Sequence, residues 1–359
     1  MSLFSSLGLG ADTSFLGVDI GTTSIKIAQL ARVKDQFSLT NYAILETYGY
    51  LDRFNAAIQT SNLKLSEENL PQYLKLLLAR GAFSSKTAVV SVPAFLAFST
   101  LIEVPAASES EIRKIIEFQA KQYISLPLSA VTLDWVRVGE RTDEVGAPKQ
   151  QIFLGSIPNE QIQKYHQIFK TAGITLRSVE VEGMSLARAL TYGAKKPVLI
   201  IDIGSRSTSF SVAQDLFLKF SGQTDFAGGS LTQTIASGLA ISPRRAEDLK
   251  KQRGMLGFGG EQELSTLILP LVDVILTEAQ RVIATFETTY RDTIAEVILS
   301  GGGSNLVGIE AYAAKQLKLP VKKADPFANI NYQRGLEPIT KEAGPLLAVA
   351  IGLGMKGFV

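Results

Sequence analysis

Two near-continuous hydrophobic runs in this sequence end in aspartate, isoleucine and glycine. The first, Phe15 to Ile20, leads into Gly21 and small hydroxylated residues, and a second apolar run follows from Ser24 to Leu30. Short apolar runs bounded by turn residues are typical of buried strands, so this segment predicts a tight hairpin. Val198 to Ile203 and Ser209 to Ala213 repeat the pattern about half a chain later. The repeat predicts two related lobes.

The hydrophobic pattern between the repeats changes after Val92. Before this point, leucines at helical spacing predict a helix over Leu63 to Leu78, and Thr87 to Val92 is expected to be a strand. After it, the pattern predicts a strand, a helix, two strands and a second helix, at Phe98 to Val104, Ser108 to Tyr123, Val131 to Val138, Gln151 to Ile157 and Glu160 to Thr171. We interpret this stretch as a small α+β module inserted into the first lobe.

The rest of the chain is mostly helical in its pattern. After the strand Arg177 to Val181, helices are expected at Ser185 to Tyr192, Ser230 to Ser237, Pro243 to Arg253, Leu264 to Tyr290, Leu306 to Gln316 and Pro345 to Met355, with a strand at Glu296 to Leu299. The predicted parts are a first lobe (1–93 with 177–195), the inserted module (94–176), a second lobe (196–225 with 296–359) and a helical subdomain (226–295).

Composition narrows the class of protein. The 359 residues are 46% hydrophobic, and 36 Lys and Arg against 34 Asp and Glu leave a net charge of +2. This balance excludes a disordered chain and argues against nucleic-acid binding by bulk charge. The absence of cysteine excludes disulfides and cysteine-ligated zinc, and fits a reducing cytosol. The longest apolar stretches fall short of the roughly 18 residues of a spanning helix, so we expect a cytoplasmic protein without its own membrane span.

The two acidic-glycine turns carry candidate chemistry. Glycine lets the backbone turn tightly and brings N–H groups close to an anion. One such turn alone is equally an ordinary hairpin. Two copies facing each other would hold a polyphosphate between the lobes, with Asp19 and Asp202 beside a hydrated Mg²⁺, which prefers carboxylates, water and phosphate oxygens. The alternative is a duplicated fold that no longer binds a ligand.

A third glycine turn, Ser300 to Ser304, follows the predicted strand that ends near Leu299. Ligands of α/β sheets bind at the carboxyl ends of strands, and glycine leaves room there for a base or ribose. By itself the triple glycine is better interpreted as a turn that enters a helix. Together with two phosphate turns it would complete a nucleotide site.

In this order, the three turns resemble the phosphate-1, phosphate-2 and adenosine motifs of the actin-like ATPase superfamily. That superfamily has an α/β, ribonuclease H-like fold of two lobes, and Glu182 to Tyr192 and Pro345 to Gly354 occupy the positions of its two connecting helices. The module inserted after Val92, the run Val179 to Leu190, the segment Ala324 to Phe327 and the overall length are most similar to the PilM branch, in type IV pilus assembly. The cell-division protein FtsA is a near relative and shares the inserted SHS2-type subdomain.

The resemblance implies a set of site residues. ATP or ADP would lie against the phosphate turns and the adenosine turn, and Asp19 and Asp202 would hold Mg²⁺ through water. The full set of nucleotide-binding candidates is Asp19, Gly21, Thr22, Thr23, Ser24, Lys26, Asp202, Gly204, Ser205, Arg206, Ser207, Glu247, Lys250, Gly301, Gly302, Gly303 and Ser304. Arg206 departs from the small residue usual in phosphate-2 and would contact phosphate or crowd it. For Glu247 and Lys250 the alternative is a solvated pair on a helix surface.

Catalysis has weaker support in the sequence than binding. Hydrolysis needs a residue that positions the attacking water, and Glu182 is the one candidate we identify. A polar residue favoured at a helix start by the macrodipole is an equally good interpretation of Glu182. We therefore expect weak or no ATPase activity, with the nucleotide acting as a conformational ligand.

The resemblance also implies partners. A PilM relative would bind the N-terminal cytoplasmic tail of a PilN-like inner-membrane protein between the first lobe and the inserted module. It would thereby be recruited to the inner face of the membrane, with pilus motor ATPases and further copies of itself as possible partners. Two alternatives stay open. FtsA typically carries an amphipathic membrane helix after a linker, whereas this sequence ends at 354–359. A sugar kinase of the same fold would need a second cleft carboxylate, for which we find no signature.

Overall fold

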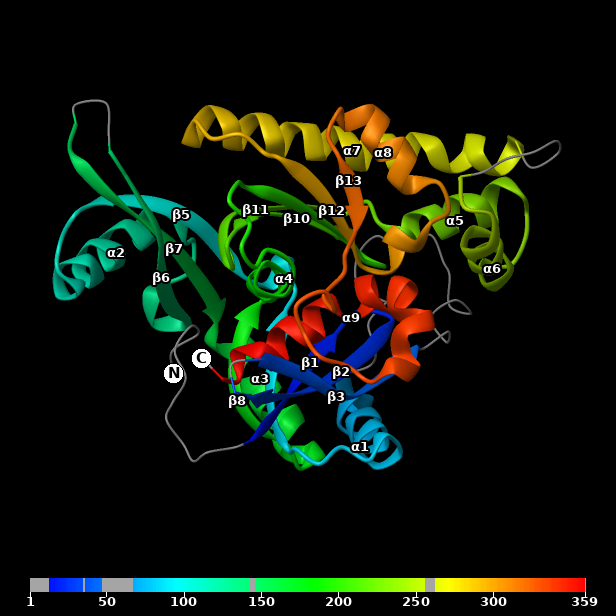
Figure 1. The fold of residues 1–359 in the computed structure, drawn as a ribbon, viewed down its shortest axis with the longest axis horizontal. Coiled ribbons are helices and arrows are strands. Elements are labelled where there is room, and N and C mark those ends of the chain that lie inside the picture. The colour runs from blue at the N-terminus through cyan, green and yellow to red at the C-terminus, as the bar shows by residue number, and fades with distance from the viewer. Residues whose placement is uncertain (1–12, 35, 47–66, 143–145, 256–261, 359) are drawn as a thin grey trace.

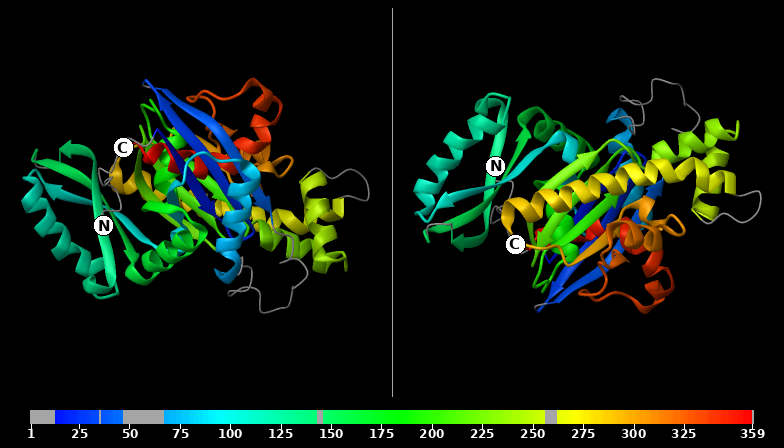
Figure 2. Two further views of the ribbon diagram at one scale, coloured as in Figure 1. Left: turned by 90° about the horizontal axis from the view of Figure 1, so that it is seen from below. Right: turned by 90° about the horizontal axis from the view of Figure 1, so that it is seen from above.

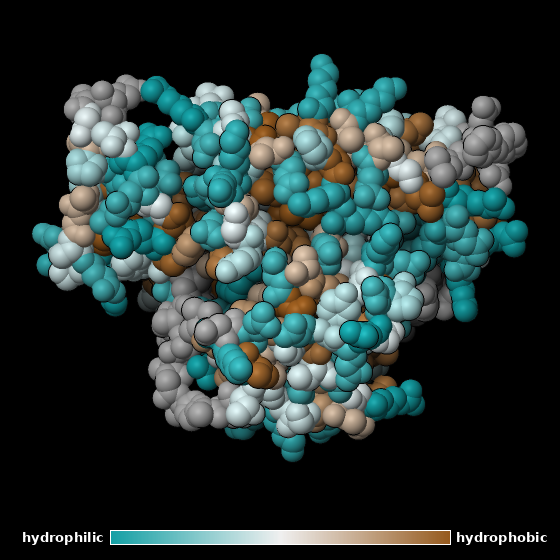
Figure 3. Space-filling model, in the orientation of Figure 1, coloured by the Kyte–Doolittle hydropathy of each residue, from teal (hydrophilic) through white to brown (hydrophobic). Residues whose placement is uncertain are grey.

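The computed structural model of the protein describes residues 13–34, 36–46, 67–142, 146–255 and 262–358. The strands of these segments form three sheets. Figures 1 and 2 show two larger sheets lying one above the other, with the smallest sheet projecting to one side. In the view of Figure 3, hydrophilic residues cover most of the surface, and hydrophobic residues show mainly near the longest helix, α7 (Gln262–Tyr290).

The two larger sheets share one plan. The first has the order β3-β2-β1-β4-β8 and the second has the order β11-β10-β9-β12-β13. Their strands are β1 (Ser14–Ile20), β2 (Ser24–Val33), β3 (Gln36–Glu46), β4 (Thr87–Val92) and β8 (Thr175–Val181), then β9 (Val198–Ile203), β10 (Thr208–Gln214), β11 (Phe217–Thr224), β12 (Glu296–Ser300) and β13 (Val321–Lys323). In each sheet the central strand pairs antiparallel with the next strand and parallel with a later one. This duplication confirms the predicted two-lobe α/β architecture.

Helices cover both faces of the first sheet, which is why most residues of its central strands are apolar and buried. On β2, Ile27 belongs to a core that includes α1 (Leu70–Gly81) and α3 (Asn159–Ala172). The next residue, Ala28, packs against α9 (Thr340–Lys356). Adjacent strand residues point to opposite faces, so the two cores lie on the two sides of the sheet.

The predicted first helix differs at its start. Its beginning at Leu63 falls outside the described residues, and residues Glu67–Asn69 form a 3-10 turn. The α-helix begins at Leu70 because Pro71 is favoured in a first turn. The leucines expected on one face, Leu70, Leu74 and Leu77, are all buried.

The third sheet and one helix form the inserted module. Its sheet has the order β5-β7-β6, with β5 (Phe98–Pro105), β6 (Val131–Thr142) and β7 (Pro148–Pro158). Helix α2 (Glu109–Tyr123), close to the predicted range, packs Ile112 and Ile116 on this sheet. Tyr123, which lies beyond this apolar face, is 48% exposed. It lies at the end of the helix, where its ring stacks near Phe98.

Helix α3 packs mainly against α1 and β8 of the first lobe, although the sequence pattern groups it with the module. Its buried residues Ile168 and Phe169 share a core with Leu74 of α1 and with Val179 of β8. The difference arises because α3 connects β7 to β8, which is a strand of the first sheet. The apolar face of α3 is therefore buried against the first lobe. The boundaries of the four parts of the chain stay a prediction.

The second sheet is covered on one face by α5 (Gly228–Gly238), α7 (Gln262–Tyr290) and α8 (Ile309–Leu317). Helix α6 (Pro243–Arg253) packs beside α5. Helix α5 begins two residues before the predicted start, because Gly228 and Gly229 are part of its first turn. The part of the chain that the structure describes contains no helix long and apolar enough to cross a bilayer.

Helix α4 (Glu182–Leu190) and helix α9 lie between the two sheets and pack against each other. They come close at Gly352, where an added Cβ would lie 2.0 Å from the carbonyl oxygen of Ser185. The guanidinium of Arg188 donates to the carbonyl oxygen of Gly352 at 2.7 Å and forms an ion pair with the buried Glu180. This tightly packed pair of helices joins the two lobes.

Candidate functional site

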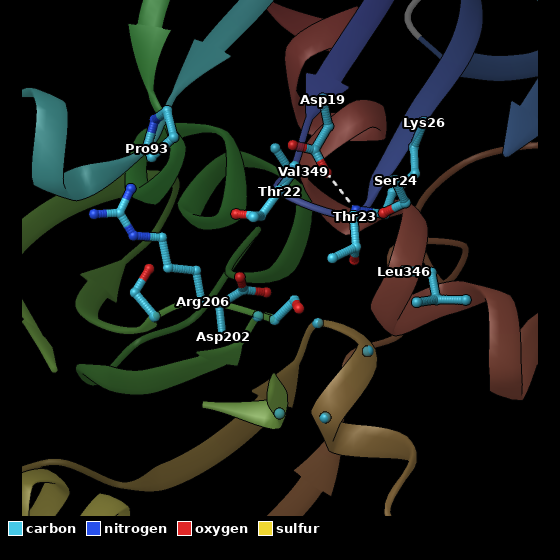
Figure 4. A pocket seen from close by; sticks show the side chains of 18 of the residues that line it. Asp19, Thr22, Thr23, Ser24, Lys26, Pro93, Asp202, Arg206, Leu346 and Val349 are labelled. Atoms are coloured by element: carbon cyan, nitrogen blue, oxygen red, sulfur yellow. Dashed lines mark hydrogen bonds and ion pairs between the residues drawn. The ribbon is translucent and has the colours of Figure 1, made fainter. Parts of the chain in front are cut away.

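The predicted turns line one cavity between the two lobes. Its volume is about 650 Å³. Figure 4 shows Asp19, Thr22 and Thr23 on the first-lobe side and Asp202 and Arg206 on the second-lobe side. Of the predicted set, the structure places these residues in the lining: Asp19, Gly21, Thr22, Thr23, Ser24, Lys26, Glu182, Asp202, Gly204, Ser205, Arg206, Ser207, Glu247, Lys250, Gly301, Gly302 and Gly303.

Ser304 is the predicted residue that the structure leaves out of the cavity lining. Its side chain is fully buried, and its hydroxyl donates to the carbonyl oxygen of Gly301 at 2.7 Å. Ser304 therefore stabilises the turn rather than facing the cavity. Serine with a local backbone partner is a common turn device.

The two acidic-glycine turns are closed by equivalent backbone hydrogen bonds. The N–H of Gly21 donates to the carbonyl oxygen of Ser24 at 2.9 Å, and that of Gly204 donates to Ser207 at 3.1 Å. A Cβ on Gly204 would lie 2.8 Å from the Ser207 carbonyl oxygen, so this turn needs glycine. The duplicated sequence thus produces duplicated turns on opposite sides of the cavity.

The third turn follows β12 and is held against the start of α9. Gly301 has a φ of 77°, a left-handed conformation that favours glycine. Its N–H donates to the carbonyl oxygen of Pro345 at 3.0 Å. A Cβ on Gly303 would lie 2.2 Å from Cγ2 of Ile203, at the end of β9. Glycine therefore lets this turn pack directly on the second acidic-glycine turn.

The two aspartates face residues of different charge. On the hairpin of β1 and β2, Asp19 faces Lys26, and their side chains form an ion pair of 2.9 Å. Burial lowers the pKa of Lys26, but the adjacent Asp19 carboxylate more than offsets this, so the pKa is raised overall. On the hairpin of β9 and β10, Asp202 faces Ser209 at the equivalent position. The repeat therefore places a cation opposite Asp19 and an uncharged residue opposite Asp202.

Glu182 extends this acidic group, because α4 begins at the cavity. Burial raises the pKa of Glu182 well above its ordinary value, and the Asp19 and Asp202 carboxylates raise it further. Burial also raises the pKa of Asp202 to about 6, although a hydrogen bond with Ser300 opposes the shift. Three carboxylates at one end of a cavity, with one lysine, would be stabilised by an added cation.

The donor set suits Mg²⁺ better than a metal held by protein alone. Among the described residues, no group of three or more Asp, Glu, His or Cys side chains is arranged to hold an ion. Mg²⁺ usually keeps several waters and is bound through one or two carboxylates and substrate phosphates. Asp202 and Asp19 fit this mode, with water and phosphate supplying the other oxygens.

Glu247 and Lys250 are a buried pair on the cavity wall, not a solvated pair. Their residues are 7% and 9% exposed. The Lys250 ammonium donates to the Glu247 carboxylate at 2.6 Å, to the Thr232 hydroxyl at 2.7 Å and to the Gly228 carbonyl oxygen at 2.9 Å. An ammonium has three donors, and all three have protein partners here.

Arg206 points across the cleft instead of lying along its own turn. Its guanidinium stacks on the ring of Phe95, with 4.2 Å between Cζ and the ring centroid. Phe95 lies in the connection from β4 to β5, two residues after Pro93 (Figure 4 labels Pro93 and Arg206). The contact joins the second lobe to the segment that leads into the inserted module.

The sequence patterns did not identify several residues that line the cavity, among them Phe95, Gln161, Lys164, Tyr165 and Ser209. The first four come from the β4 to β5 connection and from α3, and no local pattern links them to the glycine turns. Ser209 could have been identified as a site residue from the sequence, because it occupies the position in the second repeat that Lys26 occupies in the first. It is 7% exposed, and its hydroxyl has no hydrogen-bond partner within the described residues.

Known proteins provide an independent comparison. The profile of the family described as "Type IV pilus assembly protein PilM" matches residues 17–358. Among solved structures, the chain is similar to the PilM-PilN type IV pilus biogenesis complex, with a TM-score of 0.79 and 20% identity over 96% of this chain and 98% of that chain. It is also similar to MreB5 of Spiroplasma citri bound to AMPPNP, with a TM-score of 0.53 and 14% identity over 96% of this chain and 95% of that chain.

A more distant likeness is to the cell division protein FtsA of Bacillus subtilis. The two are 23% identical over 250 residues, which cover 60% of this chain and 56% of that protein. The chain thus spans just over half the length of this relative. The structural likenesses establish an actin-like fold. Because the family profile extends over nearly the whole chain, this protein belongs to the type IV pilus assembly protein PilM family.

Proposed function

We propose that this PilM-family protein binds an adenine nucleotide with Mg²⁺ in the cleft between its lobes. The observation that carries the proposal is the convergence of three glycine turns from separate parts of the chain on one cavity of about 650 Å³. The likeness to a MreB5 bound to AMPPNP adds support, because that protein has the same fold.

Each wall of the cavity would have a distinct task. The turns at Gly21 and Gly204 would receive the phosphates through backbone N–H groups and hydroxyls. Asp202 and Asp19 would orient the waters of Mg²⁺, and Glu247 would accept a hydrogen bond from a ribose hydroxyl. The bound ion would neutralise phosphate charge. Glu182 is placed to orient a water at the acidic end of the cavity, so any hydrolysis would depend on it.

We further propose that the chain is an adaptor that binds the N-terminal cytoplasmic tail of a PilN-like inner-membrane protein, which would recruit it to the membrane. Support comes from the likeness to a PilM-PilN complex over 96% of this chain. The near-neutral charge of the chain fits a peptide held by apolar anchors and backbone hydrogen bonds. Motor ATPases and further copies of this chain would be additional partners in the same assembly.

Isothermal titration calorimetry of the purified full chain with ATP and ADP, in Mg²⁺ and in EDTA, tests the nucleotide proposal. We expect binding that weakens in EDTA. We also expect the Asp202→Asn variant to lose most of this Mg²⁺ dependence, because the ion then keeps only Asp19, whose carboxylate is already paired with Lys26. Absence of binding by either nucleotide would refute the proposal. A synthetic tail peptide and its scrambled version test the adaptor role in the same instrument.

A further inference from the structure

Arg206 carries a positive charge that its surroundings in the protein do not neutralise. Within the described residues, its guanidinium stacks on Phe95 but forms no ion pair or hydrogen bond. Stacking uses the flat face of a guanidinium and leaves its N–H donors at the edges. Arg206 lines the cavity and is half-buried. A cation with open donors therefore borders the space between the lobes.

The other cations of the cavity wall already have partners. Lys26 pairs with Asp19 at 2.9 Å, and Lys250 pairs with Glu247 at 2.6 Å. The remaining lysines of the lining also interact with other groups: Lys164, Lys251 and Lys323. Among the cavity-lining cations that the structure describes, Arg206 is thus the one without an anionic or hydrogen-bonding partner in the protein.

Arg206 lies away from the third glycine turn. Figure 4 shows its side chain reaching to one side of the cavity, toward Pro93, while Leu346 lies on the other side. Leu346 borders the third turn, because a Cβ on Gly302 would lie 3.6 Å from its side chain. The guanidinium of Arg206 is therefore at the opposite end of the cavity from the turn that would receive the nucleoside.

The same end of the cavity contains Glu182. The backbone N–H of Ala94 forms a hydrogen bond with the Glu182 carboxyl group. The next residue is Phe95, whose ring lies 4.2 Å from Cζ of Arg206. The stack thus fixes the Arg206 guanidinium at the acidic end, where a water for hydrolysis would be oriented.

We propose that Arg206 binds the outermost phosphate of the nucleotide and makes the cleft select ATP over ADP. The inference rests on the proposed nucleotide site. With the nucleoside at the third turn and the phosphates at Gly21 and Gly204, the phosphate chain runs toward Arg206, so the third phosphate lies nearest to it. ADP lacks this group. The ring of Phe95 holds the guanidinium in place before binding, which reduces the conformational entropy lost when the phosphate is bound.

The ratio of the affinities for ATP and ADP tests this role. Both nucleotides are titrated with Mg²⁺ against the full chain loaded with a fluorescent ADP analogue, and their displacement of the analogue is measured. For Arg206→Met we expect the affinity for ATP to fall about tenfold, as for loss of a charge-assisted hydrogen bond, and that for ADP to change less than about twofold. An equal loss for both nucleotides would overturn the inference. A gain in affinity would also overturn it, because Arg206 would then crowd the phosphates.

Phe95→Leu tests the stack without changing any charge. Leucine keeps the position apolar but has no aromatic face to hold the guanidinium. We expect the preference for ATP over ADP to fall by about two- to fivefold, as for loss of a cation–π contact. An unchanged preference would show that Phe95 does not position Arg206.

Arg281→Met is the matched control, because it removes the same side chain from a place outside the cavity. Arg281 is 63% exposed on α7 and pairs with Glu278 of the same helix. It should leave the ratio of affinities unchanged, and a change would mean that net charge alone sets the ratio. Binding of neither nucleotide by the wild type would refute the proposed nucleotide site. Equal wild-type affinities for ATP and ADP would refute the selectivity alone.

Discussion

At the scale of single residues, glycine decides where the three turns can lie. The roles of neighbouring glycines nevertheless differ. In the third turn, a Cβ on Gly303 would lie 2.2 Å from the Ile203 side chain and 3.1 Å from its carbonyl oxygen. A Cβ on Gly302 would lie 3.6 Å from the Leu346 side chain, which is an ordinary contact. The sequence Gly-Gly-Gly does not distinguish these positions, because the difference arises from contacts with β9 and α9.

We therefore expect Gly303→Ala to destabilise the protein by about 1–3 kcal/mol, the usual cost of forcing an extra carbon into a packed site. Urea unfolding followed by circular dichroism measures this change. Gly302→Ala serves as the control in the same turn and should change the free energy of unfolding by much less. Equal effects of the two substitutions would contradict the packing of this turn on β9.

At the scale of elements, helix starts depend on a few side chains. Helix α2 begins with a capping arrangement in which the hydroxyl and the N–H of Ser108 both donate to the Glu111 carboxylate, at 2.6 and 2.9 Å. The hydroxyl hydrogen bond, followed by the backbone one, lowers the pKa of Glu111 below its ordinary value. A carboxyl group with a lowered pKa stabilises the folded state above its ordinary pKa, and this contribution is lost as the pH falls.

Replacing Ser108 by alanine removes the stronger of these two hydrogen bonds. We expect the pKa of Glu111 to rise toward its ordinary value and the stability of the protein to depend less steeply on pH in the acidic range. Nuclear magnetic resonance titration of the Glu111 carboxyl carbon measures the pKa directly. An unchanged titration would show that the N–H of residue 108 alone holds the carboxylate.

At the scale of the whole molecule, side-chain contacts cross the cleft outside the connecting helices. The stack of Arg206 on Phe95 is one of them, and it joins the second acidic-glycine turn to the segment before the inserted module. Lys251 on α6 and Glu46 on β3 form a second, looser ion pair of 3.5 Å across the cleft. Both contacts lie on the cavity lining, so they restrain the two lobes where a nucleotide would enter and leave.

We expect Phe95→Ala to accelerate release of a bound fluorescent nucleotide by about two- to fivefold, which corresponds to about 0.5–1 kcal/mol for a partly exposed cation–π contact. Stopped-flow displacement by excess ATP measures the release rate. Phe118→Ala, which removes a 67% exposed ring from α2, provides the control and should leave the rate unchanged. A rate unaffected by Phe95→Ala would mean that the stack does not restrain the lobes.

Much of the fold could be predicted because the signals are local. The strands at 87–92 and 198–203 and the helix at 243–253 match their predicted bounds, since apolar periodicity and Pro or Gly at the ends mark them. The outer strands β3, β11 and β13 were not predicted. They are partly exposed, so their apolar pattern is weaker, and pairing with a neighbouring strand stabilises them.

The sequence by itself determined the two related lobes, the three glycine turns and the acidic residues beside them, because these depend on short runs and on the conformational freedom of glycine. Only the tertiary structure decided how the side chains of the site are used. It pairs Lys26 with Asp19, places Ser209 opposite Asp202, directs Arg206 onto Phe95 and ties Lys250 to the first turn of α5. Such partners lie on other elements of the fold, so no local pattern of residues specifies them.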